Sequence, residues 1–138
     1  KMLTNLTTGS FNRAVKNPKT DSDWISYNEE NIQKFVDDPL CGAEFTVGSY
    51  CALFRLLHNM AKVKRYKNVN SELPFLLISG KDDPCTGGEK GRNASLKVLQ
   101  KAGFKDISVI TFDGMRHEIL NEVDKQKVYN EILSFFDK

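Results

Sequence analysis

Residues 75–84, FLLISGKDDP, contain a short apolar run followed by a glycine and two carboxylates. A continuous apolar run of about four to eight residues, bounded by turn-forming residues, is typical of a strand buried on both faces of a parallel sheet. A second strand is predicted at residues 107–112, ISVITF, which are rich in β-branched side chains. These two segments decide the fold class, because buried parallel strands need a long, usually helical, connection between them.

Helical patterns alternate with the two strands. Residues 89–102 carry apolar side chains on one side, and Gly103 follows them, as expected of a glycine that ends a helix. Val128, Ile132 and Phe135 mark a closing amphipathic helix. The order strand, helix, strand, helix predicts a parallel crossover of α/β type. Two strands leave uncovered edges, so we expect further strands from elsewhere.

The chain up to about residue 67 reads as helices separated by irregular turns. Asn28 is placed to cap a helix of about ten residues that ends before Pro39. Thr46 can cap a longer helix with one apolar stripe at spacings of three and four. The segment is polar around thin apolar stripes, which predicts that it lies over another part of the protein.

Charge and cysteine content exclude several classes of function. The 138 residues include 20 basic and 18 acidic side chains, with no basic block, so nucleic acid is not an expected partner. The longest apolar run is far below the roughly 20 residues that cross a bilayer, so no integral membrane segment is expected. Cys41, Cys51 and Cys85 are odd in number and widely spaced. We therefore expect free thiols, a reducing cytoplasmic compartment and no disulfide framework.

Polar side chains follow both predicted strands, where parallel α/β sheets bind their ligands. Asp82 and Asp83 follow the first strand, and His117 follows the second. A carboxylate that accepts a hydrogen bond from one ring nitrogen leaves the other free to take a proton from a hydroxyl group. The alternative is an ordinary Asp-Pro turn and a solvated histidine. Arg116 and Glu118 flank the histidine and either orient its loop or are solvated.

Competing motifs are incomplete. Residues 117–121, HEILN, have Asn where a zinc-protease helix has its second histidine. Residues 86–91, TGGEKG, lack the Gly-Lys-Ser/Thr of a phosphate-binding loop. Cys85 and His58 are interpreted as structural residues. The sequence therefore predicts no metal site and no cofactor.

At the two loops the sequence resembles a known family. Residues 76–84, LLISGKDDP, and residues 114–122, GMRHEILNE, look like the acid and histidine segments of the lysophospholipase and monoacylglycerol lipase branch of the α/β hydrolases. Residues 11–12, 20–26 (TDSDWIS) and 38–42 (DPLCG) are similar to the cap insertion of bacterial members. The resemblance covers nearly the whole chain.

This resemblance implies an α/β fold, namely the C-terminal portion of an α/β-hydrolase fold: its last two parallel strands with flanking helices, preceded by a helical cap. The cap would comprise residues 1–68 and the α/β core residues 69–138. It also implies that Asp83, the aspartate before the proline, is the acid of a catalytic triad and that His117 is the base. Asp82 stands where relatives commonly carry Lys, and it remains a second candidate for the acid.

The implied substrate is a carboxylic ester, such as a monoacylglycerol or lysophospholipid. Aromatic residues of the cap would then line an apolar pocket for the acyl chain. The alternative role for each of them is packing inside the cap. These residues are Trp24, Phe35, Phe45, Tyr50 and Phe54.

One departure from the family is large. The sequence contains neither the Gly-x-Ser-x-Gly motif that carries the nucleophile nor a His-Gly-rich oxyanion loop. Both lie ahead of the cap in such enzymes, so we interpret the chain as a fragment of a serine ester hydrolase that is inactive alone. A missing N-terminal half or a second copy would complete the sheet. The alternative is a non-catalytic α/β-hydrolase-like binding or interaction module.

Overall fold

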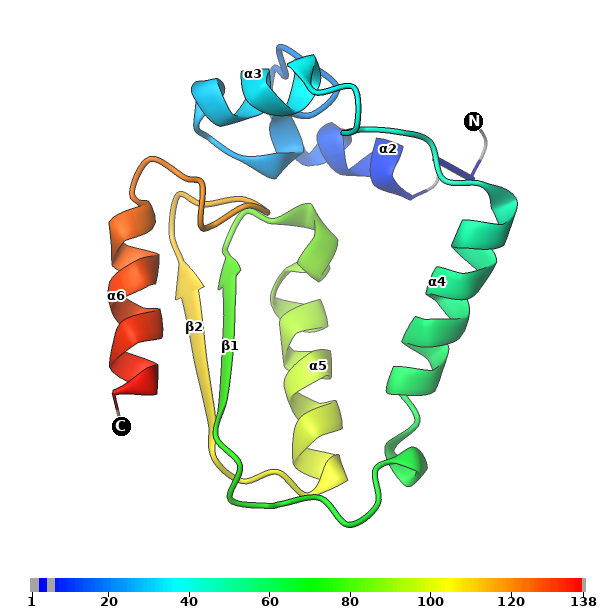
Figure 1. Ribbon diagram of the computed structural model, residues 1–138, viewed down its shortest axis with the longest axis vertical. Coiled ribbons are helices and arrows are strands. Elements are labelled where there is room, and N and C mark those ends of the chain that lie inside the picture. The colour runs from blue at the N-terminus through cyan, green and yellow to red at the C-terminus, as the bar shows by residue number, and fades with distance from the viewer. Residues whose placement is uncertain (1–2, 5–6, 138) are drawn as a thin grey trace.

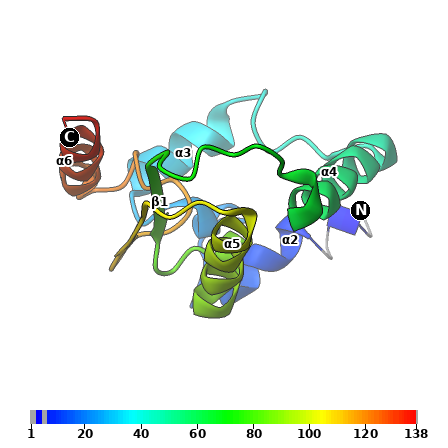
Figure 2. The same cartoon turned by 90° about the horizontal axis from the view of Figure 1, so that it is seen from below.

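The protein is described here by a computed structural model that covers residues 3–4 and 7–137. Strands β1 (Phe75–Gly80) and β2 (Ile107–Phe112) pair in parallel, with Phe75 opposite Ile107 and Gly80 opposite Phe112. The two helices of this half lie on opposite faces of the sheet (Figures 1 and 2). They are α5, Gly88–Ala102, and α6, Lys125–Phe136.

Both helices begin and end where the sequence pattern places them to within a few residues. Gly103 ends α5 with a φ of 106°, a left-handed conformation that costs glycine little. Val128 of α6 is fully buried against Phe112, Met115 and Ile119, which form the core at the carboxyl end of the sheet. The core therefore lies directly beneath the loops that follow the strands.

The two strands are only partly covered. β1 carries an apolar run, but none of its residues before Gly80 is buried, and Val109 of β2 is 46% exposed. Burial of the strands on both faces is therefore not reached within the described residues, in agreement with the expectation that two strands leave uncovered edges. The physical reason is that a sheet of two strands has two open edges, and one helix on each face cannot cover both strands fully.

The first part of the chain lies across the carboxyl ends of both strands (Figure 1). It contains short helices whose bounds are α2 Thr8–Phe11, η1 Asn12–Ala14, η2 Asp23–Ile25 and α3 Glu29–Asp37. The predicted cap of α3 is present, because the Asn28 side chain accepts a hydrogen bond from the Glu30 amide at 3.1 Å. The prediction that this segment covers another part of the protein is confirmed for these residues.

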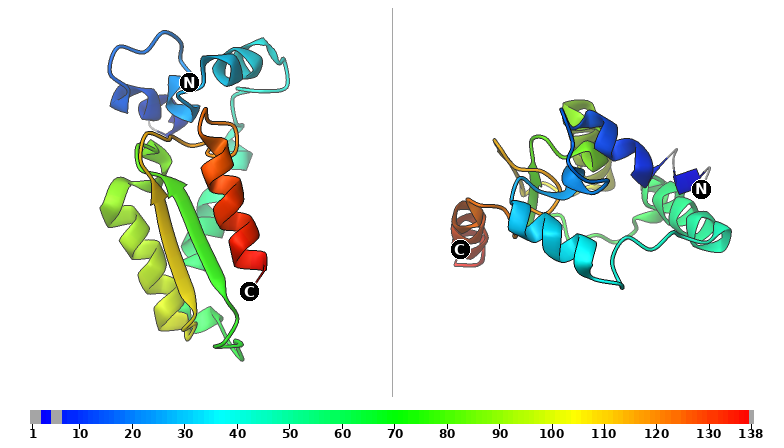
Figure 3. Two further views of the ribbon diagram at one scale, coloured as in Figure 1. Left: turned by 90° about the vertical axis from the view of Figure 1, so that its left-hand side faces the viewer. Right: turned by 90° about the horizontal axis from the view of Figure 1, so that it is seen from above.

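Helix α4, Val47–Met60, is separated from the sheet and stands on the far side of α5 (Figures 1 and 3). Its predicted cap is also present, since Thr46 accepts a hydrogen bond from the Ser49 amide at 3.1 Å. Tyr50 is the one buried residue of this helix, and its other apolar side chains are exposed. The short turns η3 (Val63–Arg65) and η4 (Pro84–Thr86) complete the described elements.

No helix in the described part of the chain combines the length and the apolar character needed to cross a membrane. The three cysteines are free and exposed in this structure.

Candidate active site

The loops that follow β1 and β2 are hydrogen-bonded to each other. The Lys81 amide donates to the Phe112 carbonyl at 2.9 Å, and the Asp82 amide donates to the Met115 carbonyl at 3.0 Å. Gly80 makes this close approach possible, because a Cβ atom there would lie 2.1 Å from the Arg116 carbonyl oxygen. The side chains that follow each strand are therefore held at one edge of the sheet.

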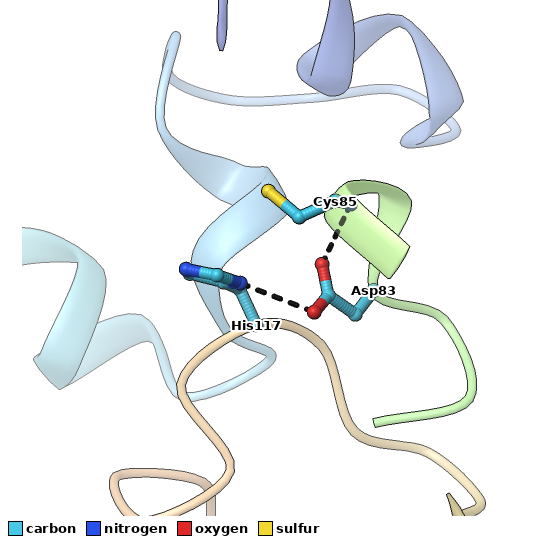
Figure 4. A group of neighbouring side chains, drawn as sticks. All are labelled: Asp83, Cys85 and His117. Atoms are coloured by element: carbon cyan, nitrogen blue, oxygen red, sulfur yellow. Dashed lines mark hydrogen bonds and ion pairs between the residues drawn. The ribbon is translucent and has the colours of Figure 1, made fainter. Parts of the chain in front are cut away.

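Asp83 and His117 meet at this edge, as Figure 4 shows. Oδ2 of Asp83 lies 3.1 Å from Nδ1 of His117, and Oδ1 accepts a hydrogen bond from the Cys85 amide at 2.8 Å. With a proton on Nδ1, the imidazole donates to the carboxylate and keeps Nε2 free. The Asp83 side chain is 7% exposed and that of His117 is 44% exposed. This is the geometry of a carboxylate that orients a histidine base.

The surroundings of His117 favour its protonated form. The hydrogen bond to Asp83, followed by the side chain of Cys85, raises the pKa of His117 from 6.5 to about 10. An imidazolium cannot accept a proton, so a histidine base needs a lower pKa at neutral pH. Burial acts in that direction, because desolvation disfavours the charged ring.

Cys85 lies beside this pair, two residues after Asp83. Its side chain is exposed, and Figure 4 shows its sulfur on the same side of the carboxylate as the ring of His117. One ligand atom from each of Asp83, Cys85 and His117 lies within 4.8 Å of the others. The interpretation of Cys85 as a packing residue missed this proximity, since the sequence does not show where the His117 ring lies.

Arg116 ties the histidine loop to the first part of the chain. Its guanidinium lies 3.8 Å from the centre of the Tyr27 ring and donates hydrogen bonds to the Asp23 and Ser26 carbonyls at 2.6 and 3.0 Å. The sequence left two roles open for Arg116, loop orientation and solvation. These contacts show that Arg116 orients the loop that carries His117.

Glu118 makes contacts of the same kind. Its amide donates to the Ile25 carbonyl at 2.7 Å, and its carboxylate accepts a hydrogen bond from the Asn31 side chain at 2.7 Å. Both residues that flank His117 are therefore bound to the segment above the sheet.

Glu122 is a residue of the site that the sequence analysis did not single out. It is 1% exposed, and its carboxylate accepts hydrogen bonds from the Ser26 hydroxyl at 2.8 Å, the Tyr27 amide at 2.9 Å and the Arg116 amide at 2.8 Å. A carboxylate is rarely buried unless it is paired or hydrogen-bonded in this way. The only sequence signal is its place at the end of the segment 114–122 that resembles the family.

Asp82 does not contact His117 in this structure. Its Oδ2 atom accepts a hydrogen bond from the Tyr27 hydroxyl at 3.1 Å. Its side chain therefore points toward the segment above the sheet, and the geometry distinguishes it from Asp83.

The predicted pocket residues are divided between two places. The Trp24 ring lies 5.1 Å from the ring of His117. Phe45, Tyr50 and Phe54 form a row at the start of α4, with ring centres 5.4 and 6.0 Å apart. A cavity of about 510 Å³ beside Asp83 is lined by none of these four aromatic residues. The fifth candidate, Phe35, lies in α3. Only Trp24 is brought to the histidine, and an acyl-binding role for all five stays a prediction.

Two comparisons with solved structures define the class of the fold. A highly thermostable carboxyl esterase from Bacillus coagulans matches with a TM-score of 0.79 and 24% identity, over 99% of this chain and 44% of the esterase. A soluble variant of monoglyceride lipase from Saccharomyces cerevisiae matches with a TM-score of 0.65 and 18% identity, over 98% of this chain and 48% of the lipase. The chain thus has the fold of part of an α/β hydrolase and spans less than half the length of either relative.

The sequence itself identifies the family. The profile of the serine aminopeptidase S33 family matches residues 1–124, and the chain belongs to this family. A comparison with curated proteins found no match. The predicted resemblance to α/β hydrolases is confirmed, and so is the fold class, since two parallel strands with flanking helices agree with the predicted C-terminal portion of that fold.

Proposed function

We propose that this chain supplies the acid, Asp83, and the base, His117, of a serine hydrolase that cleaves carboxylic esters. The observation that carries the proposal is the 3.1 Å contact between Asp83 Oδ2 and His117 Nδ1 at the carboxyl ends of two adjacent parallel strands. In this arrangement the carboxylate holds the ring in one tautomer and stabilises the imidazolium that forms during the reaction.

The nucleophile is a serine hydroxyl that lies outside these 138 residues. In α/β hydrolases the chain order is nucleophile, acid, histidine, which agrees with Asp83 preceding His117. Nε2 of His117 takes the proton of the serine as its oxygen attacks the ester carbonyl, and the ring then returns that proton to the leaving alcohol. Backbone amides outside this chain hold the oxyanion. The chain alone is inactive because it has the acid and base without the group they activate.

The substrate is an ester with an acyl chain, such as a monoacylglycerol or lysophospholipid. Support comes from the names of the two structural relatives, a carboxyl esterase and a monoglyceride lipase. Residues 1–68 act as a cap, and Trp24 contacts the substrate. The support for this contact is the 5.1 Å distance between the ring centres of Trp24 and His117. The free, exposed cysteines support a reducing, cytoplasmic location.

The sheet and α4 are completed by further protein, either an N-terminal half or a second copy. One face of α4 carries four exposed apolar residues at helical spacing: Leu53, Leu56, Leu57 and Met60, which are 37, 55, 52 and 52% exposed. We call these four residues the α4 face. An apolar surface of this kind normally marks an interface.

The experiment that tests this function uses the complete translation product of the coding sequence. We expect a fluorophosphonate probe to label one serine and the protein to hydrolyse monoacylglycerols or lysophospholipids faster than aminoacyl amides. Faster cleavage of aminoacyl amides would reject the ester substrate. If the probe labels no serine and no ester is cleaved, the chain belongs to a non-catalytic binding or interaction module.

A further inference from the structure

The cluster of Asp83, Cys85 and His117 combines three kinds of metal ligand in one place. A carboxylate oxygen, a thiol sulfur and an imidazole nitrogen lie within 4.8 Å of one another. Around a tetrahedral zinc ion, with bonds of about 2.0 to 2.3 Å, ligand atoms lie roughly 3 to 4 Å apart. The Asp83 and His117 atoms are already at 3.1 Å. Only a small movement of the exposed Cys85 side chain is needed to close the triangle.

The backbone holds these ligands in position before any ion binds. Oδ1 of Asp83 accepts the hydrogen bond from the Cys85 amide, which leaves Oδ2 directed at His117. Gly80 allows the loops that carry the carboxylate and the imidazole to pack against each other. The exposure of Cys85 and His117 gives an ion access from solvent.

We propose that Asp83, Cys85 and His117 form a binding site for a zinc ion, with the fourth position open to water. Thiolate and imidazole ligands favour zinc over magnesium or calcium, which prefer sites made of oxygen atoms alone. The site departs from the sequence expectation that the chain binds no metal. That expectation relied on closely spaced motifs, whereas these ligands come from an Asp-Pro-Cys turn and a histidine 34 positions after Asp83.

Zinc at this site would inhibit the enzyme, a consequence that rests on the proposed function. The ion occupies the carboxylate and the imidazole that act as acid and base, and it replaces the proton that they share. The histidine can then no longer accept the proton of the serine. Zinc is therefore an inhibitor of this hydrolase and not its cofactor.

Binding is tested on this chain itself, with Co²⁺ as a spectroscopic substitute for zinc. We expect one Co²⁺ per chain, a charge-transfer absorption from the cobalt–thiolate bond, and loss of that absorption when zinc is added. Cys85→Ser should abolish the absorption, and His117→Gln should weaken zinc binding by about 100-fold, because even partners that only support a ligand contribute 10- to 100-fold. Cys85 and His117 are exposed, so these variants keep the fold.

The other cysteines and the other histidine provide matched controls. The variant Cys41→Ser/Cys51→Ser and the variant His58→Gln should bind Co²⁺ like the unchanged chain. Absence of the absorption in the unchanged chain, its retention in Cys85→Ser, or one ion per two chains would overturn the proposed site.

Inhibition is measured separately on the complete protein, as the ratio of ester hydrolysis with and without zinc. Zinc should lower the rate at least tenfold in the unchanged protein and less than twofold in Cys85→Ser. Equal inhibition of both would overturn the inhibitory role. Co²⁺ binding without any ester hydrolysis would reject the proposed function and leave the metal site in place.

Discussion

Glu122 and Ser26 are 96 positions apart in the sequence, yet the Glu122 carboxylate accepts a hydrogen bond from the Ser26 hydroxyl in a fully buried contact. The same carboxylate accepts hydrogen bonds from the Tyr27 and Arg116 amides. One side chain thus joins the segment above the sheet to the loop that carries His117. The position of the histidine depends on this connection as well as on the sheet.

Glu122→Ala should lower the free energy of unfolding by about 3 kcal/mol, because it leaves two partly buried amides and the buried Ser26 hydroxyl without this acceptor. Ser26→Ala removes one of the three hydrogen bonds and should cost about 1 kcal/mol. Urea denaturation followed by circular dichroism measures both. A loss below about 0.5 kcal/mol for Glu122→Ala would show that this network does not hold the two parts together.

Gly80→Ala should separate the two loops of the site. The added Cβ would lie 2.1 Å from the Arg116 carbonyl oxygen and 2.3 Å from that of Met115, so the backbone itself must move. We expect the hydrogen bond between Asp83 and His117 to lengthen or break, seen as a changed chemical shift of the His117 ring proton by NMR.

Gly48→Ala is the matched control for this variant. Its Cβ would lie 3.7 Å from the Thr46 hydroxyl oxygen, which is an ordinary contact. It should leave the His117 signal unchanged and the stability within about 0.5 kcal/mol. The prediction fails if both variants give the same His117 spectrum as the unchanged chain.

The part of the site that directly follows the two strands could be predicted from the sequence. Asp83 and His117 each follow a strand, and parallel pairing of adjacent strands brings the residues after them to one edge. Glu122 and Arg116 could not be predicted in the same way, because their partners lie about 90 positions earlier and no periodic pattern marks them. Contacts of this kind depend on how the N-terminal part of the chain packs against the loops at the end of the sheet.

The fold shows the same limit. Periodicity correctly predicted α4 and its apolar stripe, but it cannot say whether other residues cover that stripe. Of the predicted stripe, Tyr50 is buried in this structure, whereas Phe54 and Leu57 are about half exposed. The strands were likewise recognised from their apolar runs, while their burial depends on neighbours that these residues do not provide.

His117 should titrate well above the ordinary histidine pKa of 6.5, near 10, in this chain. A folded-state pKa above that of the unfolded chain means that the bound proton stabilises the fold. This stabilisation is complete below about pH 6.5 and is lost as the pH rises through about 10. Asp83→Asn should lower the pKa of His117, because it removes the carboxylate whose hydrogen bond raises that pKa most.

NMR of the two histidine rings with a chelator present measures this titration. The variant His58→Gln assigns the signals, since it leaves His117 as the only histidine. A midpoint at or below 6.5 in the unchanged chain, or no effect of Asp83→Asn, would contradict the ion pair.

The α4 face should make this chain associate with itself in the absence of further protein. Leu56→Gln/Met60→Gln removes two apolar side chains from the centre of that face and should weaken the association at least tenfold, as interface energy is concentrated in a few residues. Sedimentation velocity over a range of concentrations measures the effect. Arg55→Gln, an exposed neighbour outside that face, serves as the control. A monomer at every concentration of the unchanged chain would reject this role.

Asp83 and Asp82 offer the sharpest test of the catalytic assignment, because two adjacent carboxylates face different partners. Asp83 orients the His117 ring, whereas Asp82 accepts a hydrogen bond from the Tyr27 hydroxyl. In the complete protein Asp83→Asn should lower kcat by roughly ten-thousand-fold, the loss known for the same change in a serine protease triad, since an amide there favours the wrong tautomer. Asp82→Asn removes a charge from an exposed residue, and its amide oxygen can still accept from the Tyr27 hydroxyl, so kcat should change by less than about tenfold. Steady-state ester hydrolysis distinguishes them, and the reverse order of effects would assign the acid to Asp82.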